Sequence, residues 1–315
     1  MNGIGRVIKM AIIGRYKNGN YIVTLLSDGT KIRENDLDFF EADFPESMDL
    51  KITNRCNMGC LMCHEDSRCD GLHGDIMSES FIDRLHPYTE LAIGGGNVLE
   101  HPDFYDFLVK CKSLNLICST TINQKHFMEN LDFIRKLRDE KLIYGLGISL
   151  TNPWQDGFID AVKEFPNAVI HVINGIVTMQ DLEELRNRRL KILILGYKEF
   201  RRGEKLYEDS DAHKRIDELK QDLYSYLPEI VHHGWFDVVS FDNLAIKQLN
   251  PQRLMSDEAW NEMYMGDDNS GEMTSASMYV DMVKREFARN SCAVDRYPIM
   301  DNIEDMFNFL RGKNG

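Results

Sequence analysis

The sequence predicts an α/β protein in which a parallel sheet is curled into a partial (β/α)6 barrel, with a small N-terminal β meander and a C-terminal α+β extension. Two observations lead to this fold class. From Met48 onward, short apolar stretches alternate six times with amphipathic helical patterns. Repeated strand–helix units form parallel sheets because each helix returns the chain to the same end of the sheet. The alternation is absent before Met48 and in the last part of the chain, so these segments are predicted to be additions to the barrel.

Residues 1–45 are predicted to form the meander. Asn18-Gly19 is a strong type I′ hairpin signal, and 21–26 alternates with β-prone residues. Asp28-Gly29 indicates a second turn. We expect this meander to cover an edge of the main domain.

Residues 46–240 are predicted to form the barrel. The six strand candidates are Met48–Thr53, Glu90–Ile93, Ile117–Ile122, Tyr144–Leu150, Ala168–Ile173 and Lys191–Leu195. Helical periodicity lies between them, and Thr178 with Asp181 resembles a capping box. In parallel sheets the ligand binds at the carboxyl ends of the strands, which directs attention to the loops after each strand.

Residues 241–315 are predicted to form the extension. Two strands are expected, 278–282 and 287–292, followed by a closing helix over 302–311 whose apolar residues recur at helical spacing.

Composition limits the possible partners. The chain has 315 residues, 43% hydrophobic and 28% charged, which is typical of a soluble globular protein. Its net charge is −14, from 51 acidic and 37 basic residues without a basic run, which disfavours binding to a nucleic-acid backbone. No stretch approaches the roughly 18 apolar residues of a membrane helix, and the N-terminus is too polar for a secretory signal. We expect a cytoplasmic protein.

Three cysteines follow the first predicted barrel strand in the spacing C-x3-C-x2-C: Cys56, Cys60 and Cys63. Three thiolates on a tight loop can bind three irons of a 4Fe–4S cubane and leave the fourth iron without a protein ligand. Gly59 permits the sharp bend that such a loop needs. Two other interpretations stay open, a zinc site with His64 as the fourth ligand and a set of structural cysteines.

The segment 49–64 resembles the signature of the radical S-adenosylmethionine (SAM) superfamily, and the resemblance extends over residues 48–240. It implies that Cys56, Cys60 and Cys63 hold a 4Fe–4S cluster whose open iron binds the amino and carboxylate groups of SAM. It also implies that reductive cleavage of SAM gives a 5′-deoxyadenosyl radical, which abstracts hydrogen from a substrate. An electron donor such as flavodoxin or ferredoxin would be a partner.

A glycine-rich segment supports this resemblance. Gly94, Gly95 and Gly96 end the second predicted strand shortly before His101-Pro102, similar to the family's G-G-E-P loop followed by H-P. Consecutive glycines let main-chain polar groups approach the amino end of SAM. Asn97 replaces the usual Glu, so an amide without a countercharge stands there. By itself, a triple glycine is equally consistent with a tight strand-to-helix turn that binds no ligand.

The resemblance assigns further contacts with SAM. Met62, just before the third cysteine, is expected near the adenine. Asn123 and Ser149 end the third and fourth predicted strands, where polar side chains reach the ribose or carboxylate. Ile173 and Leu195 lie where adenine contacts are expected. Each of these residues is also compatible with a turn or core position.

The segment around Tyr279 and Cys292 faintly resembles the start of the SPASM extensions of peptide-modifying radical SAM enzymes. Those extensions bind auxiliary clusters through many cysteines; only Cys292 remains here, so no auxiliary cluster is expected. Cys292 is a candidate hydrogen-atom donor, with a structural role as the alternative. Cys111 and Cys118 are predicted in the core, and Cys69 in a polar loop.

These features favour a peptide or protein side chain as the substrate. A small metabolite or nucleotide is the alternative within the class, and a non-enzymatic zinc-binding interaction module is the alternative of another class. Arg201 and Arg202, after the sixth predicted strand, are candidates for binding a carboxylate or phosphate, or belong to a surface charge run.

Overall fold

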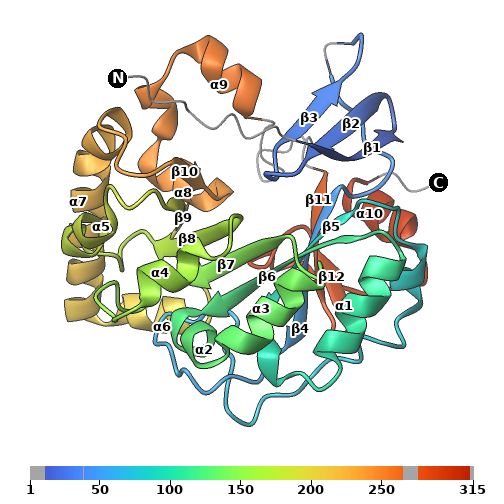
Figure 1. Ribbon diagram of the computed structural model, residues 1–315, viewed down its shortest axis with the longest axis horizontal. Coiled ribbons are helices and arrows are strands. Elements are labelled where there is room, and N and C mark those ends of the chain that lie inside the picture. The colour runs from blue at the N-terminus through green and yellow to red at the C-terminus, as the bar shows by residue number, and fades with distance from the viewer. Residues whose placement is uncertain (1–10, 38, 265–275, 313–315) are drawn as a thin grey trace.

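The computed structural model describes residues 11–37, 39–264 and 276–312, which form two sheets and a layer of helices (Figure 1). The small sheet has the order β1-β2-β3, and the large one β10-β9-β8-β7-β6-β5-β4-β11-β12-β13. The strands are β1 Ile12–Asn18, β2 Tyr21–Leu26, β3 Lys31–Glu34, β4 Ser47–Thr53, β5 Glu90–Gly95, β6 Ile117–Asn123, β7 Gly145–Ser149, β8 Ala168–Ile173, β9 Lys191–Leu195, β10 Val238–Phe241, β11 Ser277–Asp281, β12 Glu286–Ala288 and β13 Tyr297–Pro298.

Helices connect most of the parallel strands. The α-helices are α1 Phe104–Ser113, α2 Gln124–Glu129, α3 Leu131–Asp139, α4 Phe158–Lys163, α5 Met179–Leu185, α6 Arg202–Glu208, α7 Ser210–His232, α8 Asn243–Leu249, α9 Asp257–Met263 and α10 Ile303–Leu310. Short 3-10 helices are η1 Ser80–Arg84, η2 Val98–Glu100 and η3 Pro251–Leu254. The predicted capping box is confirmed, because the side chains of Thr178 and Asp181 each accept a hydrogen bond from the other's backbone N–H at the start of α5.

The large parallel sheet confirms the predicted α/β class and all six predicted strands. Adjacent strands from β4 to β10 are parallel throughout. β10, the seventh parallel strand, was not predicted because it has only four residues. Ser240 also interrupts its apolar residues.

The C-terminal strands continue the same sheet beyond β4. β11 pairs with β4 in parallel, from Ser277 opposite Ser47 to Asp281 opposite Lys51, and β12 then pairs with β11 in antiparallel fashion. The second predicted strand of this region is short and ends at Ala288 rather than at 292. The strand that precedes the cysteines therefore lies between β5 and β11, in the middle of the sheet.

The two faces of the sheet differ in what covers them. Helices α1, α3 and α4 pack on the outer face (Figure 1), where side chains such as Leu50, Leu91 and Ile148 are fully buried. Alternate residues point to the inner face, and several remain half-exposed, as the strand pattern of β6 and β8 shows. The hydrophobic core thus lies between sheet and helices, and the concave side carries polar groups.

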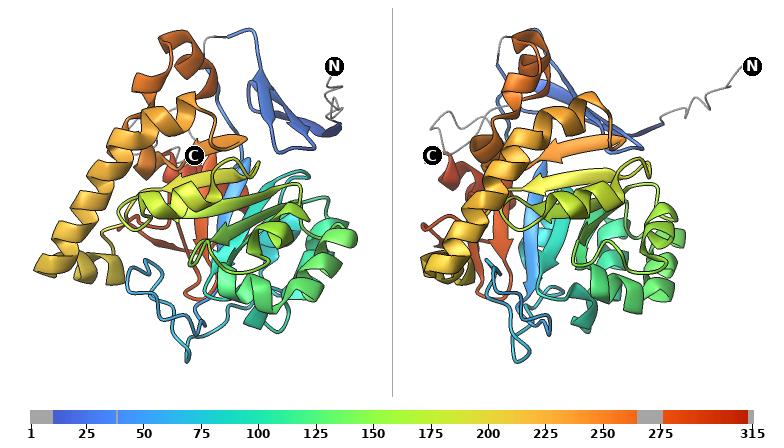
Figure 2. Two further views of the ribbon diagram at one scale, coloured as in Figure 1. Left: turned by 60° about the vertical axis from the view of Figure 1, so that its left-hand side comes forward. Right: turned by 90° about the vertical axis from the view of Figure 1, so that its left-hand side faces the viewer.

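The meander packs against the amino ends of the parallel strands. Lys31 forms an ion pair with Glu90 at the start of β5, and Asn167, just before β8, donates to the carbonyl of Ser27 at 3.2 Å. The buried Glu46, just before β4, pairs with Arg33 at 2.7 Å. These partners lie at the amino ends of the strands, and their ion pairs and hydrogen bond hold the meander there. Figure 2 shows the loop after β4 at the opposite end of the sheet.

Candidate functional site

The three cysteines lie on the loop that leaves the carboxyl end of β4. Hydrogen bonds close this loop at its base, since the N–H of Cys56 donates to the carbonyl of Arg68 at 2.8 Å and that of Asn54 to Leu72 at 2.8 Å. All three thiols are free and half-buried. Burial raises the pKa of Cys56 and Cys60, and the adjacent Cys63 raises both further. The three sulfur atoms therefore share one environment.

The glycine-rich segment binds directly to the base of the cysteine loop. The N–H of Gly96 donates to the carbonyl of Thr53 at 2.8 Å, and that of Asn97 to Arg55 at 2.7 Å. A Cβ at Gly96 would lie 2.1 Å from the oxygen of Arg55, and Gly95 has a φ of +113°. Both positions require glycine for this contact. A Cβ at Gly94 would meet nothing within 4 Å, so this glycine borders open space.

The side chain of Asn97 has a structural role in the turn. Its carbonyl accepts a hydrogen bond from the N–H of Leu99 at 3.3 Å, and its amide donates to Glu100 at 3.1 Å. The second oxygen of Glu100 pairs with Arg55 at 3.1 Å. Glu100 thus supplies a carboxylate on the same turn as the glycines, and sequence reasoning missed it because it lies three positions after the one expected.

His101 ties the glycine segment to the chain that returns from the cysteine loop. Its Nδ1 accepts a hydrogen bond from the backbone N–H of Asp103 at 3.2 Å, so the proton resides on Nε2 and is donated to the carbonyl of Gly74 at 2.9 Å. The imidazole is buried. The H-P pair therefore stabilises the packing of two loops.

The residues predicted to contact SAM lie at the carboxyl ends of neighbouring strands. Strand register places Asn123 opposite Ser149, and Ile173 opposite Leu195. All four are half-exposed on the inner face. Asn123 also caps α2, since its carbonyl accepts from the N–H of Lys125 at 2.9 Å. The structure thus arranges these residues in a row along one rim.

A buried group of charges lies beneath the cysteine loop. Lys51, on β4, is 2% exposed; its Nζ is 2.9 Å from Glu65 and 3.3 Å from Asp281. Tyr279, on β11, donates from its hydroxyl to Glu65 at 3.4 Å. Burial favours the neutral form of Glu65, but hydrogen bonding to His64 and the charge of Lys51 outweigh it and hold the pKa of Glu65 well below its usual 4.5. The group links the cysteine loop, β4 and the C-terminal strands.

Arg201 and Arg202 fasten the same loop from α6. Arg201 donates to the carbonyls of His64 at 3.3 Å and Glu65 at 3.1 Å, and Arg202 donates to the carbonyl of Ser67. Both side chains therefore bind protein groups instead of presenting a free fork to a ligand. The α6 turn packs close to the loop as well, because a Cβ at Gly203 would lie 3.5 Å from the carbonyl of Met62.

His64 points toward charged neighbours. Its Nε2 lies 3.4 Å from a carboxylate oxygen of Glu65 and 3.4 Å from the Nζ of Lys198. Burial lowers the pKa of His64, so its imidazole is neutral at pH 7. For it to be the fourth ligand of a zinc ion through this nitrogen, both contacts would have to break.

Two inward-facing titratable residues were missed by the sequence analysis. Asp49 lies on β4, seven positions before the first cysteine, and His171 lies on β8 opposite Ser149. Alternation within each strand was the available signal, because a polar residue at a period of two inside an apolar strand faces away from the core.

Three of the other four cysteines lie in the kind of environment that the sequence predicted. Cys111 and Cys118 are buried in the core, and Cys69 is exposed. Cys292 is half-buried in the loop after β12, next to Ser291, whose hydroxyl accepts a hydrogen bond from Lys198 at 3.1 Å. Its role as a hydrogen-atom donor stays a prediction.

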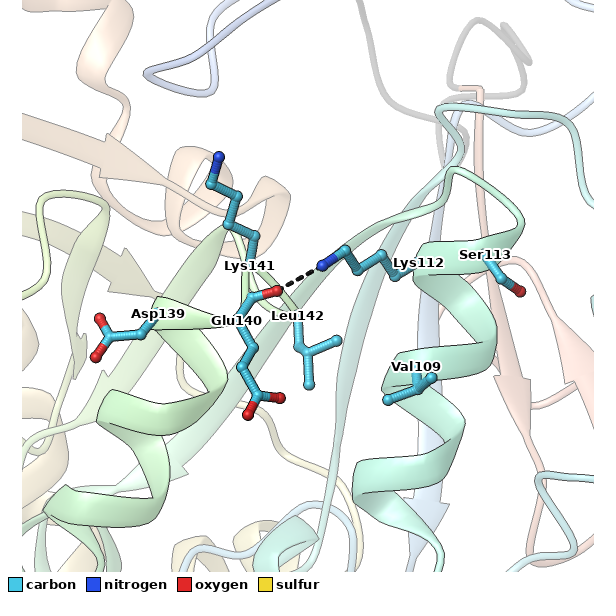
Figure 3. A pocket seen from close by; sticks show the side chains of 7 residues that line it. All are labelled: Val109, Lys112, Ser113, Asp139, Glu140, Lys141 and Leu142. Carbon is cyan, nitrogen blue, oxygen red and sulfur yellow. Dashed lines mark hydrogen bonds between the residues drawn. The ribbon is translucent and has the colours of Figure 1, made fainter.

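An open depression of about 670 Å³ lies away from this site. It is formed by α1 and the segment after α3, near the amino ends of β6 and β7, and is crossed by a 2.7 Å hydrogen bond from Lys112 to the carbonyl of Glu140 (Figure 3). Its position at the opposite end of the strands separates it from the cysteines.

Two kinds of feature are absent from residues 11–37, 39–264 and 276–312. No three His, Cys, Asp or Glu side chains there are arranged as ligands of a single metal ion. No helix in those ranges is both long and apolar enough to span a membrane.

Comparisons with known proteins identify structures of the same fold. Neither a family model nor a curated protein sequence matches the chain. Streptococcus suis SuiB bound to the precursor peptide SuiA aligns with a TM-score of 0.55 and 14% identity, covering 86% of this chain and 66% of that chain. SuiB bound to S-adenosylmethionine aligns with a TM-score of 0.54 and 14% identity, covering 86% of this chain and 66% of that chain. A further SuiB structure aligns with a TM-score of 0.56 and 11% identity, covering 94% of this chain and 86% of that chain. In the first two, this chain spans just under two thirds of the SuiB chain, and the likeness is one of fold.

Proposed function

We propose that this protein is a radical SAM enzyme in which Cys56, Cys60 and Cys63 hold a 4Fe–4S cluster and SAM binds beside them along the glycine segment. The observation that supports this most is the position of three free thiols on one loop, at the carboxyl end of a central parallel strand. Ligands bind at that end of parallel sheets. The SuiB structure with bound SAM has the same fold and agrees with the proposal.

The residues present fit this pair of cofactors. Three thiolates are the protein ligands that a cubane with one open iron requires. The open space beside Gly94 leaves room for a ligand next to the loop, and Gly95 and Gly96 bring backbone groups close to it. Glu100, on the same turn, supplies a carboxylate near the position where the family has one.

The bound cofactors would supply one-electron cleavage of SAM to a 5′-deoxyadenosyl radical that abstracts hydrogen from the substrate. The chain's own residues would bind and orient. The Lys51–Glu65–Asp281 group and Arg201 would keep the cysteine loop in place. Met62, Asn123, Ser149, Ile173 and Leu195 would contact the nucleoside and methionine parts of SAM.

A peptide or protein side chain is the proposed class of substrate. One of the SuiB structures is bound to a precursor peptide, which supports a peptide for a chain of the same fold. The inner face offers hydrogen-bonding groups from several strands, including Ser119, Thr121 and Ser240, all half-exposed. Such a face suits a polar ligand.

The test is anaerobic reconstitution of the full chain with iron and sulfide. We expect about four irons and four sulfides per chain, absorption near roughly 400 nm, and release of 5′-deoxyadenosine from SAM with dithionite. Cys60→Ala should abolish this release. Cys69→Ala is the matched control, because Cys69 is exposed in the same segment and outside the triad, and it should behave as the wild type. A colourless protein with one tetrahedral metal ion and no sulfide would refute the proposal.

A further inference from the structure

Solvent reaches the inner face of the sheet at its centre. Asp49 on β4 and Ala92 on β5 pair with each other and are both exposed, although their strands have neighbours on both sides. The residues next to them, Leu50 and Leu91, are 1% and 0% exposed on the other face. Exposure at Asp49 and Ala92 therefore comes from the concave side.

Small residues leave space on this concave side. Ala92 and Gly94 succeed each other on the inner face of β5, and Gly147 occupies β7. A Cβ at Gly147 would lie 2.4 Å from Cε1 of His171 and 2.8 Å from Oγ1 of Thr121. Glycine at this position is what allows the imidazole of His171 to lie over the inner face.

Two titratable side chains on this face have no protein partner within the ranges that the structure describes. Asp49 and His171 make neither a hydrogen bond nor an ion pair there. Protein surrounds the carboxylate of Asp49 even though solvent reaches it, and this desolvation raises its pKa. Desolvation lowers the pKa of His171 to about 4, so the imidazole is neutral at pH 7 and can donate one hydrogen bond and accept another.

Three charged groups act on Asp49: Lys198 lowers its pKa, and Glu65 and Asp242 raise it. Lys198 contacts His64 and donates to Ser291 at 3.1 Å. Glu65 pairs with Lys51 at 2.9 Å. Asp242 accepts hydrogen bonds from two backbone N–H groups, those of Gly196 at 2.9 Å and Ala245 at 2.7 Å. Asp49 makes no ion pair with any of these groups in the described ranges, since Lys198, the cation among them, is held at His64 and Ser291. A carboxylate in a desolvated site is stabilised by a cation.

We propose that the inner face of the sheet is the substrate site and that Asp49 binds a cationic group of the substrate, the ammonium or guanidinium of a lysine or arginine side chain in a peptide. His171, on β8, is a neutral hydrogen-bonding group on the same face. The net charge of −14 would favour approach of a basic peptide. This inference rests on the proposed function for the chemistry that follows binding, but binding itself can be measured separately.

The experiment compares two probes that differ only in charge. The peptides acetyl-Gly-Gly-Lys-Gly-Gly-amide and its norleucine analogue are titrated against the full chain, reconstituted anaerobically with SAM present, and binding is followed by NMR. For the wild type we expect the lysine peptide to bind about tenfold more tightly, as one desolvated ion pair provides. Asp49→Asn and Asp49→Ser should bring the ratio close to one, and Asp49→Glu should retain a preference for lysine.

The controls separate this inference from misfolding and from the proposed function. Asp139→Asn removes an exposed carboxylate on α3, far from the inner face, and should leave the tenfold preference unchanged. Thermal melts establish that each Asp49 variant is folded. Equal binding of both peptides by the wild type, an unchanged preference in folded Asp49→Asn, or no binding of either peptide at about 10 mM would overturn the inference. Iron and sulfide content of the same samples reports on the proposed function independently.

Discussion

Replacing Lys51 by Met tests whether the buried charges beneath the cysteine loop hold it in place. The ammonium of Lys51 lies 2.9 Å from Glu65 and 3.3 Å from Asp281, and the three side chains are 2%, 9% and 0% exposed. Methionine fills a similar volume but removes the cation. Two carboxylates then remain in a buried site. The guanidinium of Arg201, 3.5 Å from Glu65, still faces that carboxylate.

The expected loss of stability follows from this geometry. Removing one partner of a buried ion pair costs about 3–5 kcal/mol, because the remaining charge is left uncompensated. We expect about 3 kcal/mol, since Arg201 still faces Glu65. For a chain of this length that corresponds to a decrease in Tm of roughly 4–5 °C. Adding Asp281→Asn removes one of the two buried carboxylates left without Lys51, so the double variant should be more stable than the sum of the single effects predicts, by about 1 kcal/mol or more.

The pH dependence has a definite sign. The folded pKa of Glu65 lies well below its usual value of 4.5. A carboxyl group of this kind stabilises the folded state fully above its unfolded pKa and loses the contribution as pH falls toward the folded pKa. The Tm of the wild type should therefore fall below about pH 4.5. The fall should be shallower for Lys51→Met, because the folded pKa of Glu65 then moves toward its unfolded value.

The assay is thermal unfolding followed by circular dichroism at pH 7 and at lower pH. Lys136→Met is the matched control: Lys136 is half-exposed on α3 and 4.0 Å from Glu140, so its loss should cost less than about 1 kcal/mol. The reasoning fails if Lys51→Met melts within about 2 °C of the wild type, or if Asp281→Asn adds its full cost to it.

Two further predictions concern the loops around the site. Gly96→Ala should lower Tm by several degrees and reduce iron loading, since its Cβ would lie 2.1 Å from the oxygen of Arg55; Gly94→Ala, whose Cβ meets open space, should melt like the wild type, and equal melting of both variants would contradict this account. Glu46→Gln should loosen the meander, because Glu46 is 1% exposed and holds Arg33 and Lys31 at 2.7 and 3.0 Å. Limited proteolysis should then cut within residues 11–45 much faster than in the wild type, and an unchanged digestion pattern would show that other contacts retain the meander.

The sequence determined the α/β fold class and the strand after which the three cysteines lie. Strand–helix alternation is a local property, because each strand needs a short apolar segment and each helix an apolar stripe. The C-x3-C-x2-C spacing puts three thiols on one loop whatever the rest of the chain does. The glycine segment is identified in the same way, because a residue with a Cβ would clash with the carbonyls of Thr53 and Arg55.

Tertiary structure alone decided which distant residues meet at that loop. Lys51 and Asp281 are far apart in sequence and become neighbours because β11 pairs with β4 in parallel, and no local pattern encodes that pairing. The position of the meander against the strand ends and the free carboxylate of Asp49 likewise depend on long-range contacts. Local sequence fixes which side chains alternate along a strand, whereas strand order, set by burial of the whole sheet, fixes which charges lie across from one another.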